Sequence, residues 1–169
     1  EKPSVSILSR DSLKLQHFIS QVIENNRDNK DFIGNLNYFF LSQTDCKSLW
    51  DFKTLGEYYS YLRENNIRSL KGDLVKSYEE LEIANWLYLN GIEYEYERKY
   101  EHRTANKIYG QYTPDFYLPE YDIYLEHFGI DRSNNTAPCV SRVQYLQEIA
   151  WKRDIHKQHE TELIETYSY

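Results

Sequence analysis

Two acidic side chains lie within a stretch that otherwise has the pattern of paired strands. Residues 112–130 read YTPDFYLPEYDIYLEHFGI, with Asp115 near the start of one extended segment and Glu126 near the end of the next. If the two segments pair as a hairpin, the alternation of side chains along a strand brings the acids toward each other. Two neighbouring carboxylates repel, and the sheet would be more stable without them unless a cation lies between them.

A divalent ion is the cation that this pair would suit. Mg²⁺ and Mn²⁺ take oxygen ligands, commonly one or two carboxylates, with the remaining positions left to water and to substrate phosphate. The alternative is that each acid is an ordinary solvated residue on a wet strand face. The context favours the metal site, because Glu126 stands between Leu125 and the run His127–Gly129, where an exposed acid is unexpected.

A third acid has the spacing of an inward helical residue. In SYEELEIANWL, Glu80 is spaced with Ile83, Ala84 and Leu87 on the side that should face the sheet, whereas the neighbouring glutamates point more outward. A glutamate on the inner side of a helix needs a partner. Glu80 therefore joins the candidate site.

The elements that must position these acids follow from the pattern of the chain around them. Alternation with period two predicts strands, and apolar residues at helical spacing predict helices. The predicted elements from residue 73 onward are a helix at 77–90, strands at 92–100, 113–119 and 122–130, a helix at 143–159 and a strand at 161–169. The long helix should turn inward Val143, Leu146, Ile149, Ala150 and Ile155. This order predicts an α/β layer with a mixed sheet.

The first part of the chain has a different character. Apolar residues near helical spacing predict three helices, at residues 9–29, 31–43 and 54–66. Ser9 or Asp11 would cap the first of them. Residues 1–68 are thus predicted to form a small all-helical segment, and residues 69–169 the α/β domain.

Composition restricts the function classes. No window approaches the ~18 uninterrupted apolar residues of a membrane span, and the first residues lack the pattern of a signal peptide, so we expect a cytoplasmic protein with no membrane partner. The two cysteines lack the spacing of a zinc site.

A net charge of −7 argues against a free-standing nucleic-acid binder, unless a basic surface is local or a longer parent protein supplies it. The absence of methionine suggests a piece of such a longer polypeptide or a processed product.

Tyrosine is abundant, with 17 residues in a chain of 169. Tyrosine suits half-buried strand faces and amphipathic surfaces, and this is the favoured explanation. Stacking of the rings on nucleic-acid bases is the alternative.

The three acids and their order resemble the PD-(D/E)xK nuclease superfamily, which has the restriction-endonuclease-like fold. Pro114-Asp115 matches the PD element, Glu126 the second acid, and Glu80 the accessory acid on the preceding helix. The resemblance is closer still to the nuclease-like module inserted in some bacterial superfamily 1 DNA helicases of the helicase IV type. Three blocks carry it in order over roughly residues 68–169: KGDLVKSYEELEIANWLYLNGIEYEYE, YTPDFYLPEYDIYLEHFGI and WKRDIHKQHETELIETYSY.

The resemblance implies Mg²⁺-dependent or Mn²⁺-dependent hydrolysis of DNA by a mixed sheet flanked by helices. Asp115 and Glu126 would bind the ion with the backbone carbonyl of His127 as a further ligand, and Glu80 would hold an outer water or a second ion. The partners would be DNA and the motor domains of a parent helicase, to which residues 1–68 would belong. The chain has no Walker A glycine loop, so it is not expected to hydrolyse ATP by itself.

One position departs from the family pattern, because Phe128 stands where the family has a lysine. Some members look as if this lysine has moved to the following helix, and Lys152 is the candidate here to steer the attacking water. The alternative is a lysine on the wet face of that helix. His156, on the helical side of Lys152, is predicted at the rim of the site, and the side chain of His127 is predicted to pack.

The same departure leaves a second function open. A nuclease relic that has lost its lysine would keep the acids as structural polar groups. Such a module would bind DNA or dock onto other domains of a helicase without cutting.

Overall fold

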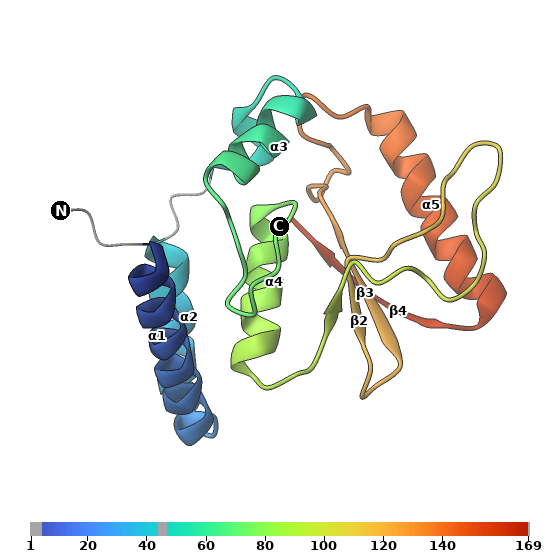
Figure 1. The fold of residues 1–169 in the computed structure, drawn as a ribbon. Helices are drawn as coiled ribbons and strands as arrows, with labels where there is room; N and C mark the ends of the chain where they lie inside the picture. Colours follow the sequence, from blue (N-terminus) through green and yellow to red (C-terminus); the bar gives the residue numbers. More distant parts are fainter. Residues whose placement is uncertain (1–4, 44–46, 169) are drawn as a thin grey trace. The chain divides into compact units, whose positions relative to one another are not determined.

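The computed structural model describes residues 5–43 and 47–168, which form two compact units (Figure 1). The first unit contains α1 (Val5–Asn26), α2 (Lys30–Gln43) and Leu89–Gly91. The second unit contains the rest of the described chain and all of the predicted site residues. Of the helices in these residues, none is long and apolar enough to cross a membrane.

Helix α1 begins earlier than predicted. It starts at Val5, so the prediction that Ser9 or Asp11 is its N-cap is wrong. The residues between Val5 and Asp11 include neither glycine nor proline, and the helix continues through them. Helix α2 begins after Asn29, whose side chain accepts a 3.0 Å hydrogen bond from the Phe32 N–H.

Helix α3 (Leu55–Glu64) belongs to the second unit. It buries Tyr58 and Leu62, which pack with Leu81 of the following helix in one apolar cluster. This packing places α3 in the second unit. The sequence pattern grouped it instead with α1 and α2, in a segment 1–68. Whether that segment belongs to a parent helicase stays a prediction.

A four-stranded mixed sheet with the order β1-β2-β3-β4 is the centre of the second unit. Its strands are β1 (Glu95–Tyr96), β2 (Phe116–Leu118), β3 (Ile123–Phe128) and β4 (Glu162–Tyr167). β2 is antiparallel to both β1 and β3, and β4 is parallel to β3. Helix α5 (Arg142–His159) makes the crossover that a parallel pair requires. The predicted α/β class with a mixed sheet is confirmed.

Strand β1 is much shorter than the predicted strand at 92–100. Glu97 has a φ of 50°, in the left-handed region, and its N–H donates to the carbonyl of Asp115 at 3.0 Å. A left-handed residue turns the chain out of its extended path, so strand pairing ends there. Strand β2 also starts later than predicted, and Asp115 lies just before it.

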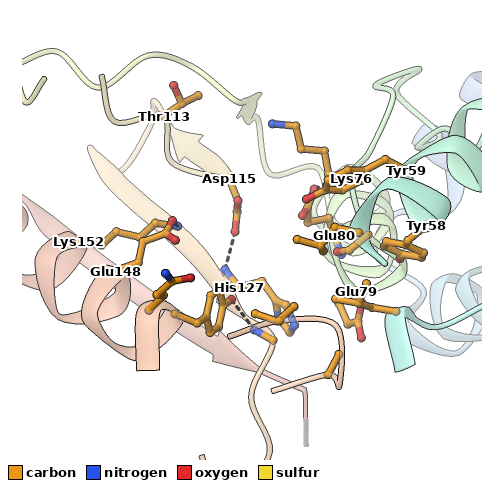
Figure 2. A pocket seen from close by; sticks show the side chains of 18 of the residues that line it. Tyr58, Tyr59, Lys76, Glu79, Glu80, Thr113, Asp115, His127, Glu148 and Lys152 are labelled. Carbon is orange, nitrogen blue, oxygen red and sulfur yellow. Dashed lines mark hydrogen bonds and ion pairs between the residues drawn. The ribbon is translucent and has the colours of Figure 1, made fainter. Parts of the chain in front are cut away.

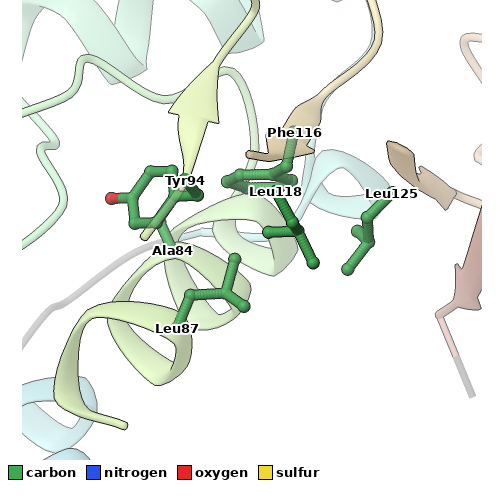
Figure 3. Close-up of a cluster of buried hydrophobic side chains, with 6 residues drawn as sticks. All are labelled: Ala84, Leu87, Tyr94, Phe116, Leu118 and Leu125. Atoms are coloured by element: carbon green, nitrogen blue, oxygen red, sulfur yellow. The ribbon is translucent and has the colours of Figure 1, made fainter. Parts of the chain in front are cut away.

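One face of the sheet packs on α4 (Tyr78–Leu89), which matches the predicted helix at 77–90. Figure 3 shows the contact between the helix and the inward residues of two strands. The buried members of this cluster are Ala84, Leu87, Tyr94, Phe116, Leu118 and Leu125.

The opposite face packs on α5, through one cluster made mainly of tyrosines and a second made of one phenylalanine and two isoleucines. Their buried members are Tyr100, Tyr112, Tyr124 and Ile155 in one, and Phe128, Ile130 and Ile149 in the other. Ile149 and Ile155 are inward as predicted, but Val143 is 67% exposed and Ala150 is also exposed, so these two predictions are wrong. Val143 lies in the first turn of the helix.

Candidate active site

Asp115 and Glu126 lie on the same face of the sheet, the one that packs on α5. The antiparallel register pairs Phe116 with Leu125, so the next pair outward is Asp115 with Glu126. Asp115 Oδ2 accepts a 2.7 Å hydrogen bond from the backbone N–H of His127, which holds the carboxylate against β3 (Figure 2). The structure therefore brings the two predicted acids together.

The charge on Asp115 is destabilised by its surroundings. Burial raises the pKa of this carboxyl well above its ordinary range, and the charges of Glu126 and Glu80 raise it further. Lys152 and the hydrogen bond from His127 act in the opposite direction but do not cancel the effect. A further cation beside Asp115 would stabilise its charged form.

Glu126 is completely buried and has two partners. Its Oε2 accepts a 2.7 Å hydrogen bond from Lys152 Nζ, and its Oε1 accepts one of 2.7 Å from the Tyr112 hydroxyl. Burial raises the pKa of Glu126, whereas Lys152 lowers it. Burial opposes the charge of Lys152, but Glu126 and Asp115 keep the pKa of Lys152 above its ordinary value. The ammonium group is therefore charged at neutral pH beside both acids.

Lys152 also reaches the ring of Phe128. This phenylalanine is completely buried on the face that packs on α5. Lys152 Nζ lies 5.8 Å from the centre of the ring. The ammonium group of a lysine from α5 thus lies near Phe128 of β3.

A chain of hydrogen bonds runs from Glu126 into the core. The Tyr112 hydroxyl lies 3.1 Å from His156 Nε2, His156 Nδ1 lies 2.8 Å from Thr161 Oγ1, and Thr161 Oγ1 lies 2.6 Å from the Tyr100 hydroxyl. Burial lowers the pKa of His156 to about 4, so the ring is neutral at pH 7. Because Tyr112 donates its proton to Glu126, it accepts the His156 proton from Nε2, and Nδ1 accepts from Thr161. The chain has one consistent direction, toward Glu126.

The prediction that His156 lies at the rim of the site is wrong, because its side chain is only 3% exposed. It does share the helical side of Lys152, but the rings of Tyr100, Tyr112 and Tyr124 surround it at centroid distances of 5.2, 5.5 and 5.2 Å. His156 therefore lies in the core next to the site, where its hydrogen bond orients the hydroxyl of Tyr112.

Glu80 is buried, as predicted, and has partners at the start of α4. Its Oε2 accepts hydrogen bonds from the Tyr96 hydroxyl at 2.5 Å and from the Lys76 N–H at 3.1 Å, while its own N–H donates to Ser77 Oγ at 3.0 Å. These bonds satisfy the first turn of the helix. Burial raises the pKa of Glu80. The charge of Glu80 in turn raises the pKa of Asp115.

The side chain of His127 lies on the other face of β3, since neighbouring residues of a strand alternate. Its Nδ1 lies 3.0 Å from Thr166 Oγ1, and its Nε2 lies 3.0 Å from Ser168 Oγ. Burial lowers its pKa. Both ring nitrogens have hydroxyl neighbours, which agrees with the predicted packing role and leaves only the backbone carbonyl as a candidate ligand.

The candidate side-chain ligands for a metal ion are few. Within residues 5–43 and 47–168, no group of three or more His, Cys, Asp and Glu side chains is arranged to hold a metal ion. Glu80, Asp115 and Glu126 are thus not assembled as a three-residue cage. Of the pair, Asp115 lines the cleft, whereas Glu126 is completely buried and both of its carboxylate oxygens accept hydrogen bonds, from Lys152 and Tyr112. An ion that keeps several water ligands, such as Mg²⁺, would therefore bind Asp115 directly and would reach Glu126 only by replacing one of these partners.

The site opens into a cleft of about 840 Å³, which Asp115 and Lys152 both line. The other lining residues come from α3 and the residues before it, the start of α4, the loop before β2, the segment between β3 and α5, and α5 itself, together with Glu97, His127 and Ser168. Figure 2 shows Asp115 between side chains of α5, such as Glu148, and side chains of α3 and α4, such as Tyr59 and Glu80.

Sequence reasoning missed Tyr112 and the aromatic residues of the cleft. Tyr112 contacts residues 14 and 44 positions away, and no local pattern signals such contacts. Trp151 and Tyr109 also line the cleft, and their rings stack at a centroid distance of 4.1 Å.

No family model matches the chain, and no curated protein and no solved structure is significantly similar to it. The assignment of a function therefore rests on the residues of the site.

Proposed function

We propose that the second unit is a metal-dependent nuclease module that hydrolyses the phosphodiester bonds of DNA. The observation that carries this proposal is the pair Asp115 and Glu126 on one face of the sheet, with Lys152 Nζ 2.7 Å from Glu126 beside an open cleft. Two acids and a lysine at the end of a strand pair are what the resemblance to PD-(D/E)xK nucleases implies. The proposed parent is a superfamily 1 helicase of the helicase IV type, whose motor domains would be partners.

Each residue has a definite role in the proposed reaction. Asp115 and Glu126 would hold Mg²⁺ or Mn²⁺, with the backbone carbonyl of His127 as a further ligand and Glu80 holding an outer water or a second ion. When bound, the ion supplies Lewis-acid stabilisation of the charge that develops on the phosphate. Lys152 orients the attacking water and offsets negative charge, and its carboxylate neighbours keep it charged for this role.

The position of Lys152 supports its assignment as the missing family lysine. Phe128 occupies the family position, and the ammonium group of Lys152 lies 5.8 Å from the Phe128 ring. A lysine from the following helix can therefore serve the same region of the site.

Replacement of Asp115 tests the proposal. We expect Asp115→Asn to reduce Mg²⁺-dependent cleavage of a fluorescently labelled DNA by at least about 100-fold, because the metal loses a carboxylate ligand. Asp154→Asn, the same change at an exposed position of α5, should cleave at the wild-type rate. Circular dichroism would verify that both variants are folded. Cleavage at the wild-type rate by Asp115→Asn would remove the proposal.

A catalytically inactive module that binds DNA or docks within the helicase is the second candidate. Phe128 at the family's lysine position favours it, as does the lack of a three-residue metal group in the described residues. Calorimetric titration with Mg²⁺ and Mn²⁺ separates the two, because a ligand of the native state must stabilise that state. Absence of binding and of any increase in Tm would favour the inactive module.

A further inference from the structure

A local basic segment stands out in this acidic chain. Residues 98–109, the basic loop, contain four cationic side chains (Arg98, Lys99, Arg103 and Lys107) and one carboxylate (Glu101), a surplus of three positive charges in a chain of net charge −7. Lys99, Arg103 and Lys107 are exposed. Positive charge of this kind attracts nucleic-acid phosphates.

The basic loop is held in place at its base. The Tyr100 N–H donates to the Tyr112 carbonyl at 3.0 Å, and the Gln111 amide donates to the carbonyls of Tyr100 and His102 at 3.1 and 2.9 Å. At its far end, Tyr109 stacks on Trp151 of α5 with an angle of 15° between the rings. Figure 1 shows the loop standing out beside α5. The last two residues of the loop, Ile108 and Tyr109, line the cleft, and Lys107 directly precedes them in the chain.

Aromatic rings line the cleft from two sides. Tyr109 and Trp151 come from the basic loop and α5, and Trp50 and Tyr59 come from the residues before α3 and from α3 itself. Trp50 is 45% exposed and Tyr59 is 41% exposed. Aromatic faces that are open to solvent in a cleft provide surfaces on which bases can stack.

The distribution of charge favours an unpaired strand over a duplex. Five carboxylates (Glu79, Glu80, Glu97, Asp115 and Glu148) and two lysines (Lys76 and Lys152) line the cleft, and this surplus of negative charge opposes the entry of phosphates. The faces of bases carry no net charge, but in a duplex they are covered by the neighbouring bases. Only a single strand can place its phosphates on the basic loop while its bases enter an acidic, aromatic cleft.

We propose that the basic loop and the cleft bind single-stranded nucleic acid, with phosphates on Lys99, Arg103 and Lys107 and unpaired bases against Trp151 and Tyr109. The strand then passes Asp115. The statement that a phosphate of the bound strand reaches the acids rests on the proposed nuclease function. The binding of the single strand does not depend on that function.

Fluorescence anisotropy in EDTA, where metal-dependent cleavage cannot occur, tests the proposal. The probes are a labelled oligo(dT) and a labelled blunt hairpin duplex with the same number of phosphates. We expect the single strand to bind at least about tenfold more tightly, since stacking of one or two bases changes affinity by this order. Equal binding, a preference for the duplex, or no binding of either would overturn the proposal.

Two variants assign the binding to the two parts of the site. The double variant Arg103→Ala/Lys107→Ala should weaken single-strand binding about tenfold and lower the slope of log K against log salt by about 1.4, which corresponds to two lost phosphate contacts. Lys14→Ala/Lys30→Ala makes the same charge change at exposed positions of the first unit and should bind as wild type. Trp151→Ala should weaken binding about tenfold, and Trp151→Phe should restore part of it.

The outcomes distinguish this inference from the nuclease function. Single-strand binding without any Mg²⁺-dependent cleavage would remove the nuclease and keep the binding site. Cleavage that is unaffected by the basic-loop and Trp151 variants, with unchanged affinity, would remove the binding site and keep the nuclease.

Discussion

At the scale of single residues, Asp115 carries a charge that its surroundings destabilise. Its carboxylate is half-buried near Glu126 and Glu80, and Lys152 offsets only part of the repulsion. The residues that would hold the ion are therefore not the residues that would give the most stable sheet. Such a conflict at one point of an otherwise apolar layer is typical of functional sites.

Asp115→Asn should stabilise the metal-free protein. At pH 7 we expect an increase in the free energy of unfolding of about 1–2 kcal/mol, measured by urea denaturation, because a half-buried charge with two acidic neighbours is removed. Since the folded-state pKa of Asp115 is raised, the folded protein binds more protons than the unfolded one, and wild-type stability rises as the pH falls toward the ordinary range near 4. The advantage of the variant should shrink over the same interval. An advantage that grows with falling pH would contradict the assignment.

Tyr112 links Glu126 to His156, and Tyr112→Phe tests that link. The variant removes a donor from Glu126 and an acceptor from His156, so we expect a loss of about 1–3 kcal/mol in the free energy of unfolding. NMR of the His156 ring should show a change in its hydrogen bonding. Tyr117→Phe removes a more exposed hydroxyl, 2.9 Å from Asp122, and should change stability by less than about 0.5 kcal/mol. Equal effects of the two variants would remove the link.

At the scale of elements, α3 provides one side of the cleft, and its start is fixed by a capping box. Thr54 Oγ1 accepts a 3.2 Å hydrogen bond from the Glu57 N–H, and the Glu57 carboxylate accepts one of 3.1 Å from the Thr54 N–H. Thr54→Ala should lower the free energy of unfolding by about 1 kcal/mol. Ser60→Ala, within the same helix, is the control and should be neutral or slightly stabilising. Thermal unfolding of both variants measures the difference.

The elements with strong periodicity could be predicted from the sequence. The hairpin of β2 and β3, the flanking helices α4 and α5, and β4 all lie where alternation or helical spacing places them. The left-handed turn at Glu97, which ends β1, has no signal in its residue type. The packing of α3 depends on contacts of Tyr58 and Leu62 with residues distant in sequence, which no local pattern contains.

For the site too, only some of the residues and contacts could be predicted from the sequence. Asp115, Glu126 and Lys152 belong to elements with clear patterns, and the register of those elements brings them together. Glu80 could be predicted to point inward, but its bond to Tyr96 could not. The chain from Tyr112 through His156 requires the full tertiary structure, because its members come from four separate segments.

At the scale of the whole molecule, metal binding should appear as thermal stability. A saturating concentration of about 100 times Kd adds about 2.7 kcal/mol to the folded state, which for a chain of 169 residues raises Tm by roughly 5–10 °C. Differential scanning fluorimetry with Mg²⁺, Mn²⁺ and EDTA measures this shift. Asp115→Asn should lose it, and Asp154→Asn should keep it. A shift of the same size in Asp115→Asn would place the ion elsewhere.

The position of β4 in the strand order bears on how the protein behaves at high concentration. β4 is one edge strand of the sheet and has six residues, whereas β1, the other edge strand, has two. An edge strand of this length can pair with the same strand of another molecule. The exposed Glu162 and the net charge of −7 oppose this pairing at neutral pH, and the net charge approaches zero near the isoelectric point of about 5.3. Light scattering should therefore find a monodisperse sample at pH 7.5 and self-association near pH 5.3.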